Sequence, residues 1–108
     1  MNKILIVSLL MASACANAES LQKPACLQFL EAGVYNGVLE DTCGFTGGVK
    51  DKLKQVYTNG GCSNIVPPEE IDVSVKNVLD DIKARYQSLG GKAFCEANKK
   101  PYYDLAGN

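Results

Sequence analysis

Histidine and tryptophan are absent from the 108-residue sequence, and neither sign of charge predominates. Without histidine the chain has no imidazole base, no Ser-His or Cys-His nucleophile pair and no histidine-ligated metal site. Eleven basic residues against twelve acidic ones give a formal net charge of -1, which excludes a strong electrostatic attraction to nucleic acid or to an anionic membrane. The hydrophobic fraction of 46% is that of a folded globular chain.

A long apolar run is also lacking, because the run over residues 4–12 is about half of the roughly 20 residues that a membrane-spanning helix needs. Lys3 precedes this run, and small or polar residues follow it and end at Ala18. This order is typical of a secretory signal peptide. We therefore expect residues 1–18 to be a signal peptide cleaved after Ala18, and residues 19–108 to form a single α-helical domain that is periplasmic or secreted.

Cys15 leaves a second interpretation open, because a cysteine after such a run can be the lipid-modified first residue of an outer-membrane lipoprotein. Ala12, Ser13 and Ala14 lack the large aliphatic residue expected three positions before that cysteine. A protein released from the membrane is therefore favoured, and a membrane is expected as a partner only if Cys15 is lipidated. In both cases Cys26, Cys43, Cys62 and Cys95 remain in the folded part, and this even number in an exported chain indicates two disulfides.

Apolar residues recur at helical spacing between groups of glycine and proline. The pattern predicts helices over residues 24–40, 46–58, about 69–89 and, more briefly, 92–99, where Pro101 should end the last one. The expected core stripes are Leu27, Leu30, Val34 and Val38, then Val49, Leu53, Val56 and Tyr57, then Ile71, Val75, Val78, Leu79, Ile82, Tyr86 and Leu89. We expect an all-α, disulfide-stapled bundle of three main helices plus a short fourth.

Two local features of this pattern carry further expectations. Gly33 and Gly37 weaken the first helix unless another helix approaches closely over them. Residues 71–75 also alternate like a short strand, so the third helix could begin near Ser74, although no partner strand is found and a helix is favoured.

The cysteine pairing follows from helix geometry. Consecutive helices joined by short connections run up and down, so Cys26 and Cys62 lie at one end of the bundle and Cys43 and Cys95 at the other. A helix of about fifteen residues is about 22 Å long, whereas a disulfide needs its Cα atoms within about 7 Å. The sequence therefore predicts the disulfides Cys26–Cys62 and Cys43–Cys95.

Catalytic chemistry finds little support in the residues. No C-x-x-C pair is present for redox chemistry or for a four-cysteine zinc site. Two pairs of neighbouring carboxylates, Glu69 with Glu70 and Asp80 with Asp81, are the conceivable acid/base groups, and they fit helix-start and solvated-face charges better. We expect no enzyme activity, no cofactor and no metal.

Surface recognition is the remaining class of function. The loop from Cys62 to Pro68 is tied down by its cysteine and stiffened by Pro67 and Pro68, so it should lose little entropy on binding. Its residues are exposed unless the loop folds back onto the bundle. The candidate partner-binding residues are Asn64, Ile65, Val66 and Pro67.

The stretch from Cys43 to Cys95 resembles a type VI secretion immunity family of small periplasmic helical proteins. The matching residues are Cys43, Gly44, Phe45, Gly48, Val49, Asp51, Cys62, Val66, Pro67, Val75, Val78, Leu79, Ile82, Phe94 and Cys95. The resemblance covers about half of the chain and implies an exported protein that covers a toxic cell-wall hydrolase. It carries no functional residues over to this sequence.

The sequence therefore predicts a non-enzymatic periplasmic protein that binds another protein, as an inhibitor or immunity factor against a cell-envelope hydrolase. One alternative is an accessory or pilotin-like factor of an envelope secretion or assembly system. A second alternative is a small carboxylate-dependent hydrolase. The expected partner is a protein, and nucleic acid is not expected.

Overall fold

The computed structural model describes residues 21–107, and within them the chain folds into four α-helices and one 3-10 turn without any strand. The helices are α2 (Lys23–Cys43), α3 (Val49–Asn59), α4 (Pro68–Leu89) and α5 (Gly91–Ala106), and the 3-10 turn η1 (Cys62–Asn64) follows α3. The predicted all-α bundle is confirmed. The predicted signal peptide, with Cys15, lies outside the described residues.

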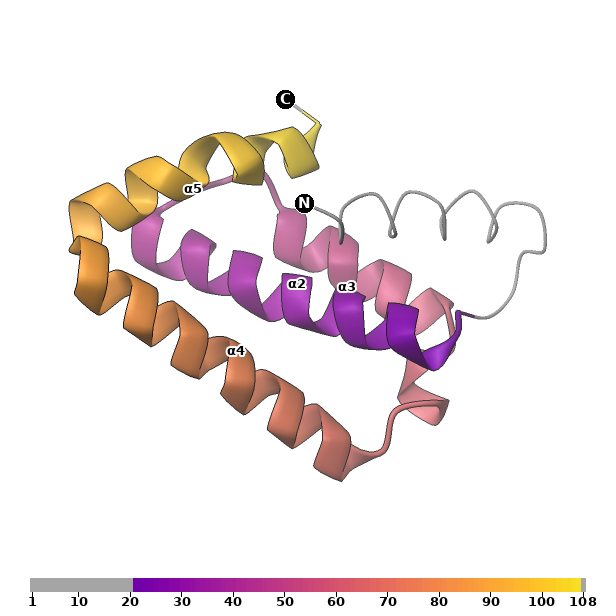
Figure 1. Cartoon of the computed structure of the whole chain (residues 1–108). Helices are drawn as coiled ribbons and strands as arrows, with labels where there is room; N and C mark the ends of the chain where they lie inside the picture. Colours follow the sequence, from indigo (N-terminus) through magenta and orange to yellow (C-terminus); the bar gives the residue numbers. More distant parts are fainter. Residues whose placement is uncertain (1–20, 108) are drawn as a thin grey trace.

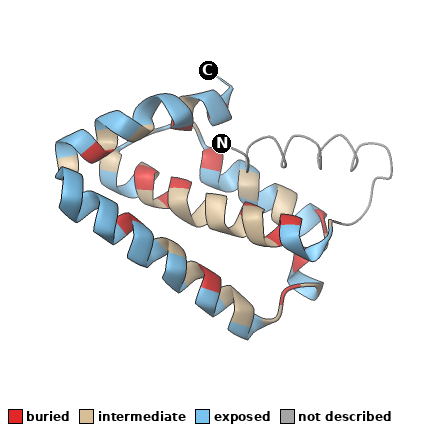
Figure 2. Ribbon diagram, in the orientation of Figure 1, coloured by how far each residue is buried: buried red, intermediate tan, exposed pale blue. Residues whose placement is uncertain are grey.

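Helix α2 lies in the middle of the bundle, with α3 on one side, α4 on the other and α5 crossing near its C-terminal end (Figure 1). Figure 2 shows the consequence, because most of α2 is buried or half-buried while much of α4 is exposed. The predicted stripe of Leu27, Leu30, Val34 and Val38 is only half-buried. The fully buried side chains of α2 include Phe29 and Leu39, which lie off that stripe, because neighbours cover the helix on several sides.

Another helix approaches closely over the two glycines inside α2, as the sequence predicts. A Cβ atom on Gly37 would lie 2.9 Å from Cδ of Lys50, and one on Gly33 would lie 3.8 Å from Cβ of Leu53. Both neighbours belong to α3, so α3 is the helix that approaches closely over this face. A Cβ atom at Gly33 would make an ordinary van der Waals contact, and one at Gly37 would displace the flexible end of the Lys50 side chain, so the approach of α3 does not by itself require glycine at either position.

Helix α4 begins at Pro68, so the alternative start near Ser74 is wrong. Proline suits the first helical turn because its missing N–H has no partner there in any case. Of the seven residues in the predicted stripe, only Ile82 is fully buried, and Leu79 is 44% exposed. The stripe correctly predicts the helix, but α2 and α5 cover only part of it.

Helix α5 runs to Ala106, so the prediction that Pro101 ends a short fourth helix is wrong. Pro101 has no N–H to donate to the preceding turn, and its ring is exposed to solvent. Packing compensates for this loss, because the next residue, Tyr102, is completely buried and stacks on Phe45 with ring centroids 5.0 Å apart. The side chain of Ala106 is buried as well, which fixes the last turn.

The main core lies between the C-terminal end of α2, the start of α3, the second half of α4 and α5. Its buried members are Leu39, Val49, Ile82, Phe94, Tyr102 and Ala106. Gly47 is required in this core, because a Cβ atom there would lie 2.6 Å from Cβ of Ala106 and 3.1 Å from the Tyr102 ring. Near the end of α5, Tyr102 is completely buried, Tyr103 is half-buried and Leu105 is 50% exposed.

Polar pairs fix the positions of the outer helices on α2. The Ser74 hydroxyl on α4 donates to the Glu31 carboxylate over 3.0 Å. The Tyr35 hydroxyl donates to Oδ1 of Asn98 on α5 over 2.8 Å. Both bonds are partly shielded from water, so each resists sliding of the helices against α2.

Tyr102 joins α5 to the connection between α2 and α3. Its hydroxyl donates to the Glu40 carboxylate over 2.7 Å and accepts the N–H of Gly47 over 2.8 Å. Burial, together with the hydrogen bond to Glu40, raises the pKa of Tyr102 above the ordinary value. The folded state therefore holds this proton more tightly than the unfolded chain does.

Replacing Tyr102 with phenylalanine is expected to cost about 1–3 kcal/mol at pH 7, because the Glu40 carboxylate and the Gly47 N–H lose their partner. The stability contributed by a raised pKa is complete below the unfolded tyrosine pKa of about 10 and is lost as the pH rises through the folded value. The free energy of unfolding should therefore fall more steeply above pH 10 in the original protein than in Tyr102→Phe. Urea titrations between pH 7 and 11.5 measure both effects.

Tyr103→Phe is the matched control. Hydrogen bonds from Thr46 lower the pKa of Tyr103, so its ionisation favours the folded state at high pH. This variant should not flatten the alkaline decline. Parallel pH curves for the original protein and Tyr102→Phe would contradict the assignment.

Candidate functional site at the Cys26–Cys62 end

Both predicted disulfides are present. Cys26 and Cys62 are joined with their Cα atoms 5.5 Å apart, and Cys43 and Cys95 with theirs 5.6 Å apart. The first disulfide fastens the loop after α3 to the first turn of α2. We call this region the clamped end and define it as residues 21–26 together with residues 60–70.

The loop of the clamped end is a compact hydrogen-bonded turn. The N–H groups of Ile65 and Val66 both donate to the Cys62 carbonyl, over 3.0 and 2.9 Å. The Leu21 N–H donates to the Gly60 carbonyl over 3.0 Å and joins the chain before α2 to the end of α3. These hydrogen bonds pair backbone groups of the turn within the protein itself, so the shape of the turn does not depend on a binding partner.

The candidate residues of this loop have different positions. Asn64 is exposed, whereas Ile65 and Pro67 are half-buried. Val66 is only 2% exposed, so its prediction as an exposed contact residue is wrong. The loop folds back, and Val66 packs with Cys26 and Cys62 in a small second core. Burying one valine between the loop and α2 anchors the loop and leaves Asn64 at its tip.

Ser63 is exposed beside Asn64 and was not among the predicted site residues. The two residues complete the 3-10 turn after Cys62. The sequence predicts a stiff loop tied down by its cysteine, with Asn64, Ile65, Val66 and Pro67 as its candidate contact residues. The signal that could have identified Ser63 is the run Cys62-Ser63-Asn64, because Ser and Asn favour tight turns in which their side chains face solvent.

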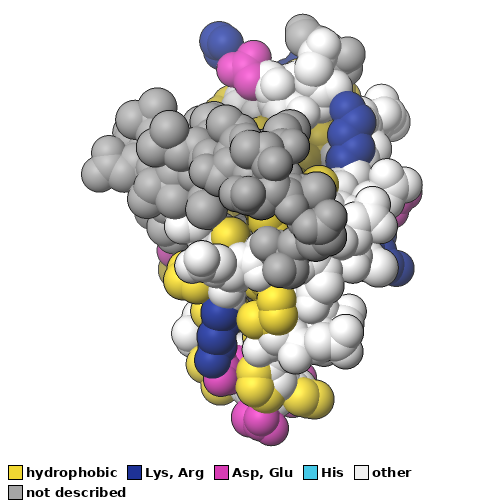
Figure 3. Space-filling view, turned by 90° about the vertical axis from the view of Figure 1, so that its right-hand side faces the viewer, with side chains coloured by type: hydrophobic (Ala, Val, Ile, Leu, Met, Phe, Trp, Pro, Cys, Tyr) yellow, Lys and Arg dark blue, Asp and Glu magenta, His cyan; other side chains and the backbone are white. Residues whose placement is uncertain are grey.

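An ion pair at the surface of the clamped end joins α2 to α4. The Lys23 ammonium on α2 lies 2.7 Å from the Glu70 carboxylate on α4. Both side chains are about 40% exposed, so the pair adds little stability. Figure 3 views this end of the molecule, and its lower half shows hydrophobic side chains beside basic and acidic ones. The end therefore presents a mixed apolar and charged surface.

Two polar atoms near this packing lack a hydrogen-bond partner. The Tyr57 hydroxyl and Oε1 of Gln28 are buried and unpaired among the described residues. Burial raises the pKa of Tyr57 above the usual tyrosine value. Tyr57 packs against the second core as the sequence predicts, but its hydroxyl is not in contact with solvent.

The neighbouring carboxylates lie on the surface of α4. Lys76 binds Asp80 over 2.7 Å, and Arg85 binds Asp81 over 2.9 Å. Lys76 pairs with Asp80, one turn after it, and not with Asp72, one turn before it. Within residues 21–107 no group of three or more His, Cys, Asp or Glu side chains is arranged to hold a metal ion. No helix among these residues combines the length and hydrophobicity that a membrane span requires.

Comparisons with known proteins found no match for this chain. No family model, no curated protein and no solved structure is significantly similar to it.

Proposed function

We propose that the protein is an exported, non-enzymatic protein-binding domain whose clamped end inhibits a cell-envelope hydrolase. One observation carries the proposal. The exposed tip of the loop, Ser63 and Asn64, stands on a base that the Cys26–Cys62 disulfide and the buried Val66 hold in place.

The physical argument is the entropy of binding. A flexible loop loses conformational freedom when a partner orders it, and this loss weakens the complex. The described loop is already ordered by its disulfide, its hydrogen bonds to the Cys62 carbonyl and the packing of Val66. A partner therefore meets a preformed contact surface, as in protein inhibitors that present a rigid loop to an enzyme cleft.

The compartment and the class of partner rest on different observations. Two structural disulfides suit an oxidising environment such as the bacterial periplasm. The N-terminal signal-like segment and the resemblance to periplasmic immunity proteins support the same compartment. A cell-wall hydrolase is then the partner whose neutralisation the resemblance implies.

The proposal predicts that the purified protein slows a purified peptidoglycan amidase or glycosidase in a cell-wall clearing assay. Ser63→Arg combined with Asn64→Arg should weaken this inhibition at least about tenfold, because long charged side chains would displace the partner from the loop tip. Both positions are exposed, so the variant should fold normally. Inhibition constants for each hydrolase measure the effect.

Lys54→Glu is the matched control. Lys54 is exposed on α3, away from the loop, so this change should leave inhibition unaltered. Inhibition of no cell-wall hydrolase would contradict the proposal. Equal inhibition by the loop variant would place the binding surface elsewhere. Isolation with a membrane-embedded secretion assembly instead of a hydrolase would support a pilotin-like role.

A further inference from the structure

The rest of the structure covers a hydrophobic strip of helix α4 only in part. Leu79 and Tyr86, two helical turns apart on one side of the helix, are 44% and 40% exposed. Val75 continues the strip toward the N-terminus and is half-buried. Helix α2 and the start of α5 pack against the neighbouring side of α4, where Ile82 is buried. We call Val75, Leu79 and Tyr86 the α4 strip.

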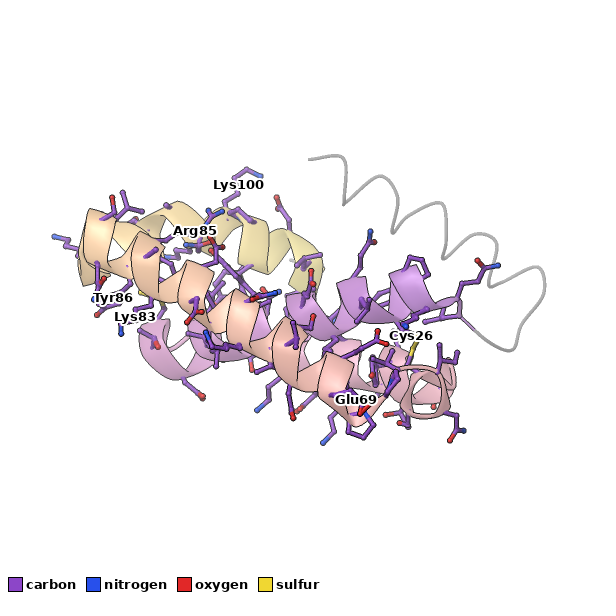
Figure 4. The ribbon with its side chains drawn as sticks, turned by 60° about the horizontal axis from the view of Figure 1, so that its bottom comes forward. Cys26, Glu69, Lys83, Arg85, Tyr86 and Lys100 are labelled. Carbon is purple, nitrogen blue, oxygen red and sulfur yellow. A yellow bond between two sulfur atoms is a disulfide. The ribbon has the colours of Figure 1, made fainter. Side chains whose placement is uncertain are left out.

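Charged residues border the α4 strip in a definite order. Glu69 and Asp72 lie at its N-terminal end and Lys83 near its C-terminal end, and all three are exposed. Figure 4 shows Lys83 and Tyr86 on one side of α4 and Arg85 on the other. Among the described residues, Glu70, Lys76, Asp80, Asp81 and Arg85 are used in ion pairs, and Asp72 and Lys83 are not.

The spacing of Asp72 and Lys83 places them on the same side of the helix. They are eleven positions apart, which is about three turns of helix and about 16 Å along its axis. Two α4 helices laid side by side in opposite directions can therefore bring Asp72 of each copy to Lys83 of the other at the same time. An interface between identical chains with two-fold symmetry must be its own complement, and this arrangement of charges meets that condition.

We propose that the protein forms a two-fold symmetric homodimer through antiparallel pairing of α4. The two-fold axis passes at the level of residues 77 and 78. The Leu79 side chains of the two copies then lie within about 5 Å of one another along the axis, between the two Val75 side chains. Tyr86 of each copy lies at the level of Glu69 of the other, and its ring, which packs against Phe94 of its own chain with centroids 5.5 Å apart, borders the interface with its exposed edge.

Charge reversal tests this arrangement directly. Sedimentation or light scattering of the purified protein should show a concentration-dependent dimer. A single pair of helices is a small interface, so dissociation is expected in the micromolar range. In a dimer of Asp72→Lys, the introduced lysine of each chain faces Lys83 of the other chain, so two positive charges meet at both contacts. In a dimer of Lys83→Glu, the introduced glutamate of each chain faces Asp72 of the other, so two negative charges meet at both contacts. Each variant alone should weaken the dimer at least about tenfold.

Mixing the two variants provides the decisive measurement. In a mixed dimer, the side chain introduced by Asp72→Lys in one chain meets the side chain introduced by Lys83→Glu in the other, so opposite charges face each other again. At the second contact, the unchanged Lys83 of the first chain meets the unchanged Asp72 of the second. The mixture should therefore restore the association that each variant weakens by itself. Lys54→Glu on α3 changes the net charge by the same amount as Lys83→Glu and should dimerise like the original protein.

Three results would overturn the proposal. The first is an original protein that remains monomeric at millimolar concentration. The second is a dimer that both charge variants leave unaltered, and the third is a mixture in which no heterodimer forms. Circular dichroism of each charge variant checks that the fold is intact. Leu79→Asp changes the α4 strip rather than its charged border, and it should also yield monomers.

Discussion

Replacing Ile82 with aspartate is expected to unfold the protein or to lower its melting temperature drastically. Ile82 is 6% exposed and belongs to the main core with Leu39 and Phe94. An unpaired carboxylate at this position would lose its hydration without gaining a hydrogen-bond partner, which costs several kcal/mol. Small domains have a total stability of about 5–15 kcal/mol. Thermal unfolding followed by circular dichroism measures the loss.

Leu79→Asp is the matched comparison, because it makes the same kind of change three positions earlier on α4. The apolar pattern places Leu79 and Val78 in the core and predicts that aspartate at either position unfolds the domain. The structure leaves Leu79 44% exposed and Val78 half-buried, so Leu79→Asp should melt within a few degrees of the original protein. Equal losses for the Ile82 and Leu79 variants would contradict the described packing of α4.

This contrast shows what periodicity can predict. Leu79 and Ile82 have the same helical spacing and the same hydrophobicity, so the pattern identifies the helix and the general direction of its apolar side. How much of that side is buried depends on where α2 and α5 pack, and the sequence pattern of α4 alone does not specify this tertiary arrangement. The same limit applies to α2, whose stripe suggests burial on one side although its neighbours cover several.

The errors at Val66 and Pro101 have related causes. Local propensity predicts an exposed loop and a last helix that ends at the proline. In each case one buried side chain determines the local conformation, since Val66 packs against the Cys26–Cys62 disulfide and Tyr102 packs inside the main core. The stabilisation from these contacts depends on residues far away in the sequence, so rules based on local sequence do not predict it.

The disulfide pairing was predictable because it depends on length rather than on packing. A helix that separates two cysteines holds them further apart than a disulfide can reach, whatever its side chains contact. The candidate site was predicted in part for the same reason. The attachment of the loop to α2 follows from the pairing of Cys62 with Cys26, whereas the exposure of Asn64 and the burial of Val66 do not.

The proposed dimer and the proposed inhibitor loop are compatible in space. The clamped end includes the start of α4, so antiparallel pairing of two α4 helices would place the two loops at opposite ends of the dimer. The loop tip, Ser63 and Asn64, would lie outside the paired residues 69–86, although Glu69 of the clamped end would take part in the pairing. The Asp72→Lys variant therefore separates the two proposals, because it should weaken dimerisation at least about tenfold while leaving single-site inhibition of a hydrolase intact.

Removing either disulfide is expected to destabilise the protein by about 4 kcal/mol. The bridges close loops with sequence separations of 36 and 52, and loss of chain entropy in the unfolded state depends only weakly on loop length. The paired substitutions Cys26→Ala with Cys62→Ala, and Cys43→Ala with Cys95→Ala, remove one bridge each without leaving a free thiol. Urea unfolding of the two variants should show similar losses of free energy.

The local consequences of the two removals should differ, and this difference tests the role of the clamped end. Among residues 21–107, the buried members of the second core are Cys26, Cys62 and Val66, so removing its disulfide should release residues 60–67 while the main core stays formed. Hydrogen exchange at Ile65 and Val66 should then approach that of a free loop. The Cys43–Cys95 variant should keep this protection, because its bridge lies beside the six buried residues of the other core. Equal protection of the loop in both variants would mean that Val66 alone holds it, and the disulfide would then have no part in presenting Ser63 and Asn64.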